Sequence, residues 1–500
     1  THGEFSLNVD HEFANGLSLN LVTGHSEYEY SDGIDADFLP VQFIGRSDDS
    51  EFEAFFQEVR LSSDEAARFS WVLGANYIET TQEIDRSVTF DGTLGQPNFM
   101  RVLTCPAPQL LGACGLPTFI NYTPQQLQAL TGGAVPFGVE GVSMFSQSAR
   151  VSNWKQDTES FAVFAQGTFD ISESLQLTAG LRYVEESKEA TARTDLTTGA
   201  FGLDNPVPPA ANPLFHGVWA ASFDTWAHAF DEERDTDELL SSVSLKWSAS
   251  DDHLFYVSYA EGFKTGGFNA ADDQAPLFLS DGTILRDQPG PGFEYEDETA
   301  WSVEVGGKHT FLDGALRINW AAFNTENEDE QVSTFVGLGF VVTNAASSES
   351  QGLEIDAAWQ LTEKLRANLA VGFLDAEYTS YPGAGCTAMQ QDALRGLNNA
   401  APGGTLTPSS PVISAMGCEQ QFLGSGQTSS GAQDLTGAPL FGADYSGSFG
   451  LEFNQPLGSM MWFTQIDVNF TDERFMTGTF DPIDIQEGSE LVNLRTGLRG

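Results

Sequence analysis

The sequence has few basic residues and no long apolar run. Lys and Arg total 22 against 71 Asp and Glu, giving a net charge of -49. Because such a chain repels a phosphate backbone, nucleic acid is excluded as a partner. No apolar run approaches the roughly 18 residues that a transmembrane helix requires. Aromatic residues make up 12% of the chain, which is too many for a disordered protein.

Short motifs of common enzymes are also missing. The chain contains no G-x-S-x-G elbow, no H-E-x-x-H pair, no P-loop and no EF-hand loop, and its seven His residues form no ligand cluster by spacing. A G-x-G-x-x-A string at Gly383, Gly385 and Ala388 lies in a long polar segment without a following helix, so we attribute it to chance. The sequence therefore predicts no enzyme, no cofactor and no resident metal.

Initiation and export signals are absent from the chain. It begins at Thr1 without a signal peptide and stops at Gly500 within a strand-like pattern, so we interpret it as an internal piece of a longer exported protein. Its four cysteines form two local pairs, neither with a zinc-ligand neighbour, which favours an oxidising compartment. We expect disulfides between Cys105 and Cys114 and between Cys386 and Cys418, with buried or free thiols as the alternative.

What the chain does have is alternation of apolar and polar residues. Leu175, Leu177 and Leu181 share one face of an extended segment, and Thr178 lies on the other. A soluble sandwich has strands of about 5 or 6 residues, and a propeller repeats every 40 to 50 residues or so; neither pattern is present. Strands of about 9 to 11 residues with one apolar face are typical of an outer-membrane β-barrel. The clearest predicted antiparallel strands are 159–169, 175–187, 239–248, 253–262, 298–310 and 314–327.

Short and long connections alternate along the chain, as in outer-membrane barrels. The short turns lie near Asn15, Asp64, Ser172, Asp251, Asp313, Glu363 and Pro456, and the long segments are 26–51, 81–157, 189–236, 263–295, 379–440 and 472–487. To keep the alternation, residues 344–350 must lie within one long strand, as a bulge, with a hairpin at 336–339. The count is then about fifteen strands. Because single-chain bacterial barrels have even numbers, we expect the barrel to be incomplete.

One segment carries a family resemblance. YAEGFKTGGFNA at 259–270 resembles the signature of TonB-dependent outer-membrane receptors, through Tyr259, Gly262, Phe263, Lys264, Gly266, Gly267, Phe268 and Asn269. Further blocks that are similar to this family follow in order at 55–63, 69–79, 159–188, 298–332, 342–359 and 491–500. The resemblance thus covers nearly the whole chain and is weakest in the long loops.

The resemblance implies an all-β barrel of about 22 antiparallel transmembrane strands around an N-terminal plug, in the outer membrane of a Gram-negative bacterium. We expect residues 1–500 to be an incomplete barrel that lacks the plug, the TonB box and the closing end. The implied function is TonB-dependent uptake of a scarce ligand, most often a ferric siderophore. Alternatives are cobalamin, haem, oligosaccharides or aromatic compounds, and, in a different class, a passive porin or structural barrel. The implied partners are the TonB complex through the missing N-terminal region, outer-membrane lipid and lipopolysaccharide, and a small-molecule or metal-chelate ligand.

The signature residues also have a purely structural interpretation. The glycines of the signature permit tight bends at a strand exit. Phe263 and Phe268 are expected to pack at the outer membrane interface, and Lys264 and Asn269 are expected to face the lumen. No ligand-binding residue is assigned. The acidic stretches 231–237, 294–298 and 326–330 are interpreted as solvated faces, with divalent cations bridging them to lipopolysaccharide as the alternative.

Overall fold

A computed structural model of the chain describes residues 2–35, 44–64, 66–90, 149–197, 228–270, 276–279, 283–290, 292–336, 339–387, 389–391, 393–394, 413–420, 422–423, 427–428, 432–440, 442–478 and 480–500. One antiparallel sheet of 15 strands dominates these residues, as the sequence predicts. In order across the sheet they are β1 (His2–Glu12), β2 (Ser18–Asp35), β3 (Ile44–Ser62), β4 (Phe69–Phe90), β5 (Ala149–Ser172), β6 (Leu175–Thr197), β7 (His228–Ser250), β8 (His253–Lys264), β13 (Glu298–Phe311), β14 (Leu316–Val336), β15 (Gly339–Thr362), β16 (Leu365–Ser380), β23 (Tyr445–Leu457), β24 (Met460–Thr471) and β27 (Ser489–Arg499).

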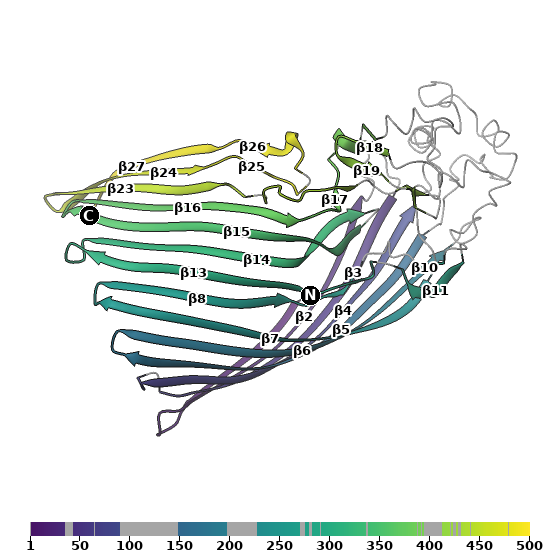
Figure 1. The fold of residues 1–500 in the computed structure, drawn as a ribbon, viewed down its shortest axis with the longest axis horizontal. Coiled ribbons are helices and arrows are strands. Elements are labelled where there is room, and N and C mark those ends of the chain that lie inside the picture. The colour runs from purple at the N-terminus through teal and green to yellow at the C-terminus, as the bar shows by residue number, and fades with distance from the viewer. Residues whose placement is uncertain are drawn as a thin grey trace.

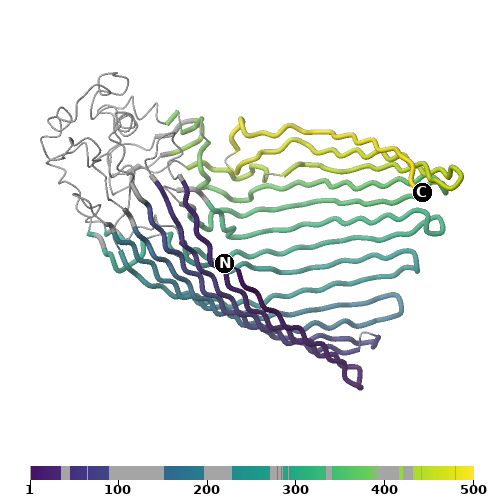
Figure 2. The backbone as a smooth tube through the Cα atoms, turned by 180° about the vertical axis from the view of Figure 1, so that it is seen from behind, coloured from purple at the N-terminus to yellow at the C-terminus, as the bar shows by residue number. Residues whose placement is uncertain are grey.

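The sheet is strongly curved and has two free edges. Each strand pairs with its neighbours in the order above, and among the described residues β1 pairs only with β2 and β27 only with β24. Figure 1 shows the strands lying side by side in a curved sheet. Figure 2, which views the molecule from behind, shows the N-terminal strands lying at an angle to the C-terminal strands. Within the described ranges, no helix is long and apolar enough to cross a membrane.

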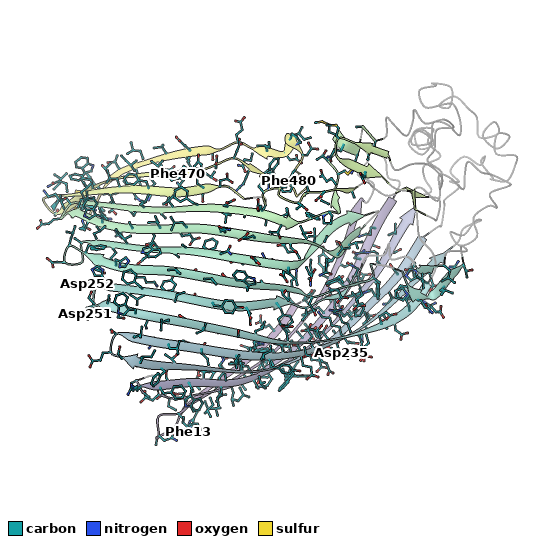
Figure 3. All side chains as sticks on the ribbon, in the orientation of Figure 1. Phe13, Asp235, Asp251, Asp252, Phe470 and Phe480 are labelled. Carbon is teal, nitrogen blue, oxygen red and sulfur yellow. A yellow bond between two sulfur atoms is a disulfide. The ribbon has the colours of Figure 1, made fainter. Side chains whose placement is uncertain are left out.

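The short turns near the seven predicted positions lie at one end of the sheet, which we call the turn end; the opposite end is the loop end (Figure 1). Asp251 and Asp252 form one two-residue turn there, and Phe13 lies in another (Figure 3). In the turn between β23 and β24, Gly458 has a φ of 65°, a left-handed conformation that glycine adopts without a Cβ clash. The turns near the seven predicted positions are confirmed.

The strands extend further toward the loop end than the sequence predicts. β5, β6 and β7 contain 24, 23 and 23 residues, so the predicted segments 159–169, 175–187 and 239–248 are only their turn-end parts. Three of the predicted long connections, 26–51, 81–157 and 189–236, are therefore too long, and the one placed at 81–157 covers only 91–148. The other three, 263–295, 379–440 and 472–487, agree with the observed connections to within a few residues. Beyond the apolar segments, polar side chains lie on both faces of the strands, so the sequence does not alternate there. The backbone hydrogen bonds between strands nevertheless continue, and cross-strand side-chain pairs such as Thr81 with Asp157, at 2.6 Å, accompany them.

The expected bulge within residues 344–350 is present. β14 ends at Val336 and β15 starts at Gly339, so the hairpin lies where the sequence places it. The register between these strands shifts around Glu330, and that between β15 and β16 shifts at Ser347. The parity argument from short and long connections therefore holds for this part of the chain.

The two faces of the sheet differ in chemistry. Phe161, Val163 and Leu181 are exposed on one face, which we call the apolar face. Alternate residues form the polar face, where Thr168 and Thr178 share a hydrogen bond of 3.0 Å and Tyr256 donates to Glu304 over 2.6 Å. Because side chains alternate along a strand, this arrangement leaves one face suited to lipid and the other to water.

Small sheets lie in the connections at the loop end: β9 (Gly267–Phe268) with β12 (Glu294–Tyr295), β10 (Pro276–Phe278) with β11 (Ile284–Pro289), β20 (Phe422–Leu423) with β21 (Gln427–Thr428), β25 (Arg474–Phe475) with β26 (Ile485–Gln486), and a four-stranded sheet of β17 (Ala384–Gly385), β18 (Ile413–Ala415), β19 (Cys418–Gln420) and β22 (Ala432–Gln433). A 3-10 helix, Pro482–Asp484, precedes β26. Cys386 and Cys418 are buried and joined by a disulfide, the pairing that the sequence predicts for them. Cys105 and Cys114 lie outside the described residues.

Candidate functional site

The signature segment leaves the sheet at the end of β8 and folds over the polar face. Gly267 and Phe268 form β9, which pairs with Glu294 and Tyr295 of β12. We call residues 264–270 and 292–297 together the β9–β12 ribbon. A Cβ on Gly266 would overlap the carbonyl oxygen of Tyr295, so only glycine permits the two segments to approach this closely.

Aromatic packing holds the ribbon against the sheet. Phe268 and Phe293 are buried, with ring centroids 5.3 Å apart, and Phe293 packs edge-on against Phe230 of β7 at 5.0 Å. Trp154, Ala190 and Ala192 complete this cluster. The prediction that Phe268 packs at the membrane interface is therefore wrong, because β9 turns its side chain toward the polar face. Phe263 remains on β8, opposite Thr299 and half-buried on the apolar face.

A single arginine joins the ribbon to β7. Arg234 contacts Glu294 at 2.6 Å, Glu296 at 2.9 Å and Asp297 at 3.1 Å, and its side chain is only 10% exposed. Burial acts to lower the pKa of this guanidinium, but its hydrogen bonds to the three carboxylates outweigh burial and raise the pKa above its ordinary value. Arg234 thus stays charged and holds three acidic residues that would otherwise repel one another.

Asp297 is the centre of the polar contacts around the ribbon. Its carboxylate accepts hydrogen bonds from the Gly266 N–H at 2.6 Å and from the Thr236 hydroxyl at 3.0 Å, in addition to the contact with Arg234. Burial acts to raise the pKa of Asp297, yet these hydrogen bonds and the arginine hold it below its usual range. On the other side, Lys188 donates to the Thr265 hydroxyl at 2.8 Å and to the Gly266 carbonyl at 2.5 Å.

Acidification is expected to loosen the ribbon through Asp297. Its folded pKa lies below the unfolded value of about 3.9, so its stabilising contribution is complete above that pH and is lost as pH falls through the folded pKa. Hydrogen exchange of residues 264–270, corrected for the intrinsic rate, should therefore accelerate as pH drops below about 4. The Asp297→Asn variant should lose this extra pH dependence; an unchanged profile would count against a role for Asp297.

Asn269 links the ribbon to β15. Its side chain is 3% exposed, donates to the carbonyls of Gly292 and Val342, each at 2.8 Å, and accepts from the Val342 N–H at 2.7 Å. A neighbouring contact repeats this arrangement, since Asn344 of β15 accepts from the Glu296 N–H at 2.6 Å. That Asn269 faces the lumen stays a prediction; in the structure its side chain joins two chain segments.

The Asn269→Ala variant is expected to lose about 1–3 kcal/mol of unfolding free energy, because it removes the side chain that bonds the backbone groups of Val342 and Gly292. Asn269→Asp, which keeps the acceptor for the Val342 N–H, is the matched control and should separate the lost donor from the lost acceptor. Denaturant titration of the refolded receptor measures both. If Asn269→Ala is as stable as the native protein, the ribbon is not held by this residue.

The other signature residues divide between the two faces. Tyr259 donates to Glu261 over 2.7 Å on the apolar face, and Gly262 has open space around it. Lys264 is exposed and 3.9 Å from Glu298. The structure thus brings Gly266, Gly267, Phe268 and Asn269 together in the buried part of the ribbon, leaves Lys264 exposed at its start, and keeps Tyr259, Gly262 and Phe263 on β8. A ligand-binding role for any of them stays a prediction.

Sequence reasoning missed the residues that hold the ribbon. Lys188, Arg234 and Asn344 lie far from the signature in the chain, and only Arg234 carried a signal, as the single base within the acidic run 231–237. That run and residues 294–298 are therefore partly neutralised by an ion pair rather than simply solvated. Among the described residues, no group of three or more His, Cys, Asp and Glu is arranged to hold a metal ion.

Comparison with known proteins gives consistent matches. The family model described as TonB dependent receptor-like, beta-barrel, matches residues 1–498. The probable TonB-dependent siderophore receptor PiuA of Acinetobacter baumannii is 23% identical over 158 residues, which are 31% of this chain and 19% of that protein.

Two solved structures resemble the fold. The ferric yersiniabactin uptake receptor FyuA from Yersinia pestis has a TM-score of 0.57 at 12% identity, with 99% of this chain covering 53% of that one. The siderophore receptor PiuA from Acinetobacter baumannii has a TM-score of 0.55 at 12% identity, with 99% of this chain covering 57% of that one. This chain thus spans about half the length of either structure. The matching family comprises outer-membrane transport receptors of Gram-negative bacteria rather than enzymes. Since the family model matches nearly every residue, the chain belongs to the TonB-dependent receptor-like β-barrel family.

Proposed function

We propose that this chain is the barrel wall of an outer-membrane receptor that takes up a ferric siderophore in a TonB-dependent manner. The observation that carries the proposal is the family match over residues 1–498, together with relatives whose names describe siderophore receptors. The apolar face then contacts lipid, the turn end lies in the periplasm and the loop end faces the outside, where it meets lipopolysaccharide. The polar face and the β9–β12 ribbon line the path of the ligand.

A receptor of this kind binds and releases its ligand without covalent chemistry. We further propose that the plug and the TonB box belong to parts of the receptor outside residues 1–500, where the TonB complex would engage them. The 53% and 57% coverage of the two solved receptors supports this division. The long connections at the loop end are suited to ligand capture, since loops on a rigid barrel carry binding residues.

Uptake by cells that express the intact gene tests the function. Strains with and without the gene receive a panel of radiolabelled ferric siderophores, cobalamin, haem, oligosaccharides and small aromatic compounds, in iron-poor medium. We expect gene-dependent accumulation of at least one ferric siderophore, abolished by deletion of TonB. Gene-dependent entry that persists without TonB would instead establish a passive porin. Accumulation of another ligand alone would reject the siderophore and keep the transporter class.

A further inference from the structure

Two histidines that are 56 positions apart in the sequence meet at the turn end, where their Nδ1 atoms are 3.3 Å apart. His253 begins β8 and lies opposite His309 of β13. His309 shares the apolar face with Val305, which is 43% exposed, because side chains alternate along the strand. Trp320 of β14 donates from its indole Nε1 to Nε2 of His309 over 3.1 Å. A Cβ on Gly307 would overlap both of these nitrogens, so only glycine permits this contact.

The two contacts determine which ring nitrogens carry protons when both imidazoles are neutral. The indole nitrogen is only a donor, so Nε2 of His309 accepts and the proton of that ring lies on Nδ1. His309 therefore donates from Nδ1 to Nδ1 of His253, which leaves the proton of His253 on Nε2. We call Trp320, His309 and His253 the indole–imidazole relay. Among the described residues, His309 is the only hydrogen-bond partner of His253, so the relay ends in an N–H group without an acceptor.

Aromatic rings extend the relay along the apolar face. The ring centroid of Phe311 is 5.0 Å from that of His253, and the centroid of Phe255 is 4.8 Å from that of His309. Trp247 of β7 stacks on Phe255 at 5.6 Å. Trp247 and Phe311 are 50% and 39% exposed. Exposed aromatic rings of this kind gather at the membrane–water interface, at the level of the lipid headgroups. The free N–H group of the relay therefore lies where a phospholipid places its phosphate.

The charges near the relay favour a headgroup that carries its own cation. Asp251 and Asp252 directly precede His253 and are exposed at the turn end (Figure 3). In the part of the chain that the structure describes, neither carboxylate has a hydrogen-bond or ion-pair partner. The bases of the neighbouring strands alternate onto the polar face: Lys246, Lys308 and Arg317. Two carboxylates without a counter-charge repel a purely anionic headgroup, whereas they attract an ammonium group.

We propose that the relay and the turn at Asp251 and Asp252 bind the headgroup of a phospholipid with an ethanolamine group, in the leaflet that faces the periplasm. The phosphate accepts a hydrogen bond from Nε2 of His253, and the ammonium group lies against the two carboxylates. The acyl chains continue along the apolar face past Val257, which is 41% exposed. The inference rests on the proposed function only for the position of the turn end in the periplasm.

Native mass spectrometry of the intact receptor in detergent tests this site. The receptor is titrated with phosphatidylethanolamine and, separately, with phosphatidylglycerol of the same acyl chains, and the affinity for the first bound lipid is measured. We expect phosphatidylethanolamine to bind more tightly. His253→Phe should weaken its binding about tenfold, as loss of one hydrogen bond to a charged acceptor implies. His253→Gln, which keeps an N–H donor, should retain most of the affinity. Heat-modifiable migration on a gel verifies that each variant is folded.

His11→Phe is the matched control, because His11 also lies at the turn end on the apolar face but packs against Phe13, outside the relay. This variant should bind phosphatidylethanolamine as the native receptor does. Equal affinities for the two lipids, equal affinities of the native and His253→Phe receptors, or an equal loss in His11→Phe would each overturn the proposal. Displacement of the lipid by inorganic phosphate would overturn it in favour of a free-phosphate site. Siderophore uptake is measured separately in cells, so failure of the lipid site is distinguishable from failure of the proposed function.

Discussion

Replacing Leu181 with Arg is expected to lower the unfolding free energy of the receptor in lipid vesicles by about 2–4 kcal/mol. Leu181 is 55% exposed on the apolar face, opposite Ala165, in the middle of the segment 175–187. In lipid, the guanidinium must either lose its hydration or distort the bilayer, and this cost is greatest at the midplane. Urea titration of the protein refolded into vesicles, with heat-modifiable migration on a gel as a second readout, measures the effect.

Gln166→Arg is the matched control for this change. Gln166 lies one register row from Leu181, opposite Gly180, but its side chain belongs to the polar face and is exposed. An arginine there remains hydrated, so the expected change is within about 0.5 kcal/mol. Equal losses from Leu181→Arg and Gln166→Arg would reject the assignment of the two faces, and with it the membrane-spanning barrel.

The alternation around Leu181 explains why the sheet could be predicted from the sequence. Where one face meets lipid and the other meets water, every second residue is selected for apolarity, and the two-residue turns at 251–252 and 173–174 are short enough to identify. The same reasoning placed residues 344–350 inside β15, because only then do short and long connections alternate. Strand number and pairing order therefore follow from local patterns.

The parts of the strands nearest the loop end could not be predicted from alternation. Residues 152–158 of β5 carry polar side chains on both faces apart from Trp154, so their pattern resembles that of a loop although the backbone ladder continues. Their cross-strand contacts, such as Asn153 with Glu83 at 2.9 Å, join residues about seventy positions apart. No local pattern encodes such pairs.

The β9–β12 ribbon was missed for a related reason. The signature residues form a recognisable set in the sequence, but an aromatic residue at a strand exit commonly lies at the membrane interface, so the sequence predicts that position for Phe268. Its burial depends on Phe293 and Phe230, which are 25 and 38 positions away in the sequence. Likewise, nothing near Gly266 in the sequence indicates that Asp297 accepts its N–H.

The Arg234→Met variant is expected to destabilise the ribbon by about 3–4 kcal/mol. Arg234 is the cation between Glu294, Glu296 and Asp297, and removing it leaves a partly buried cluster of carboxylates without a counter-charge. Breaking a buried ion pair by removing one partner costs about 3–5 kcal/mol. The expected loss is at the lower end because water reaches Glu294 and Glu296. Hydrogen exchange of residues 264–270 and denaturant titration of the refolded receptor measure the local and the global effect.

Two further variants separate the geometry of this contact from its charge. Arg234→Lys keeps the charge but cannot spread several donors over three carboxylates, so an intermediate loss is expected. Arg193→Met removes an arginine from the neighbouring strand β6, where its side chain is 66% exposed and pairs with an exposed Asp195; this surface pair should contribute at most about 1 kcal/mol. If Arg234→Met behaves like Arg193→Met, the carboxylates of the ribbon are hydrated well enough to need no arginine. The aromatic cluster around Phe268 and Phe293 would then hold the segment alone, and the exchange rates of residues 264–270 would respond to Phe293→Ala instead.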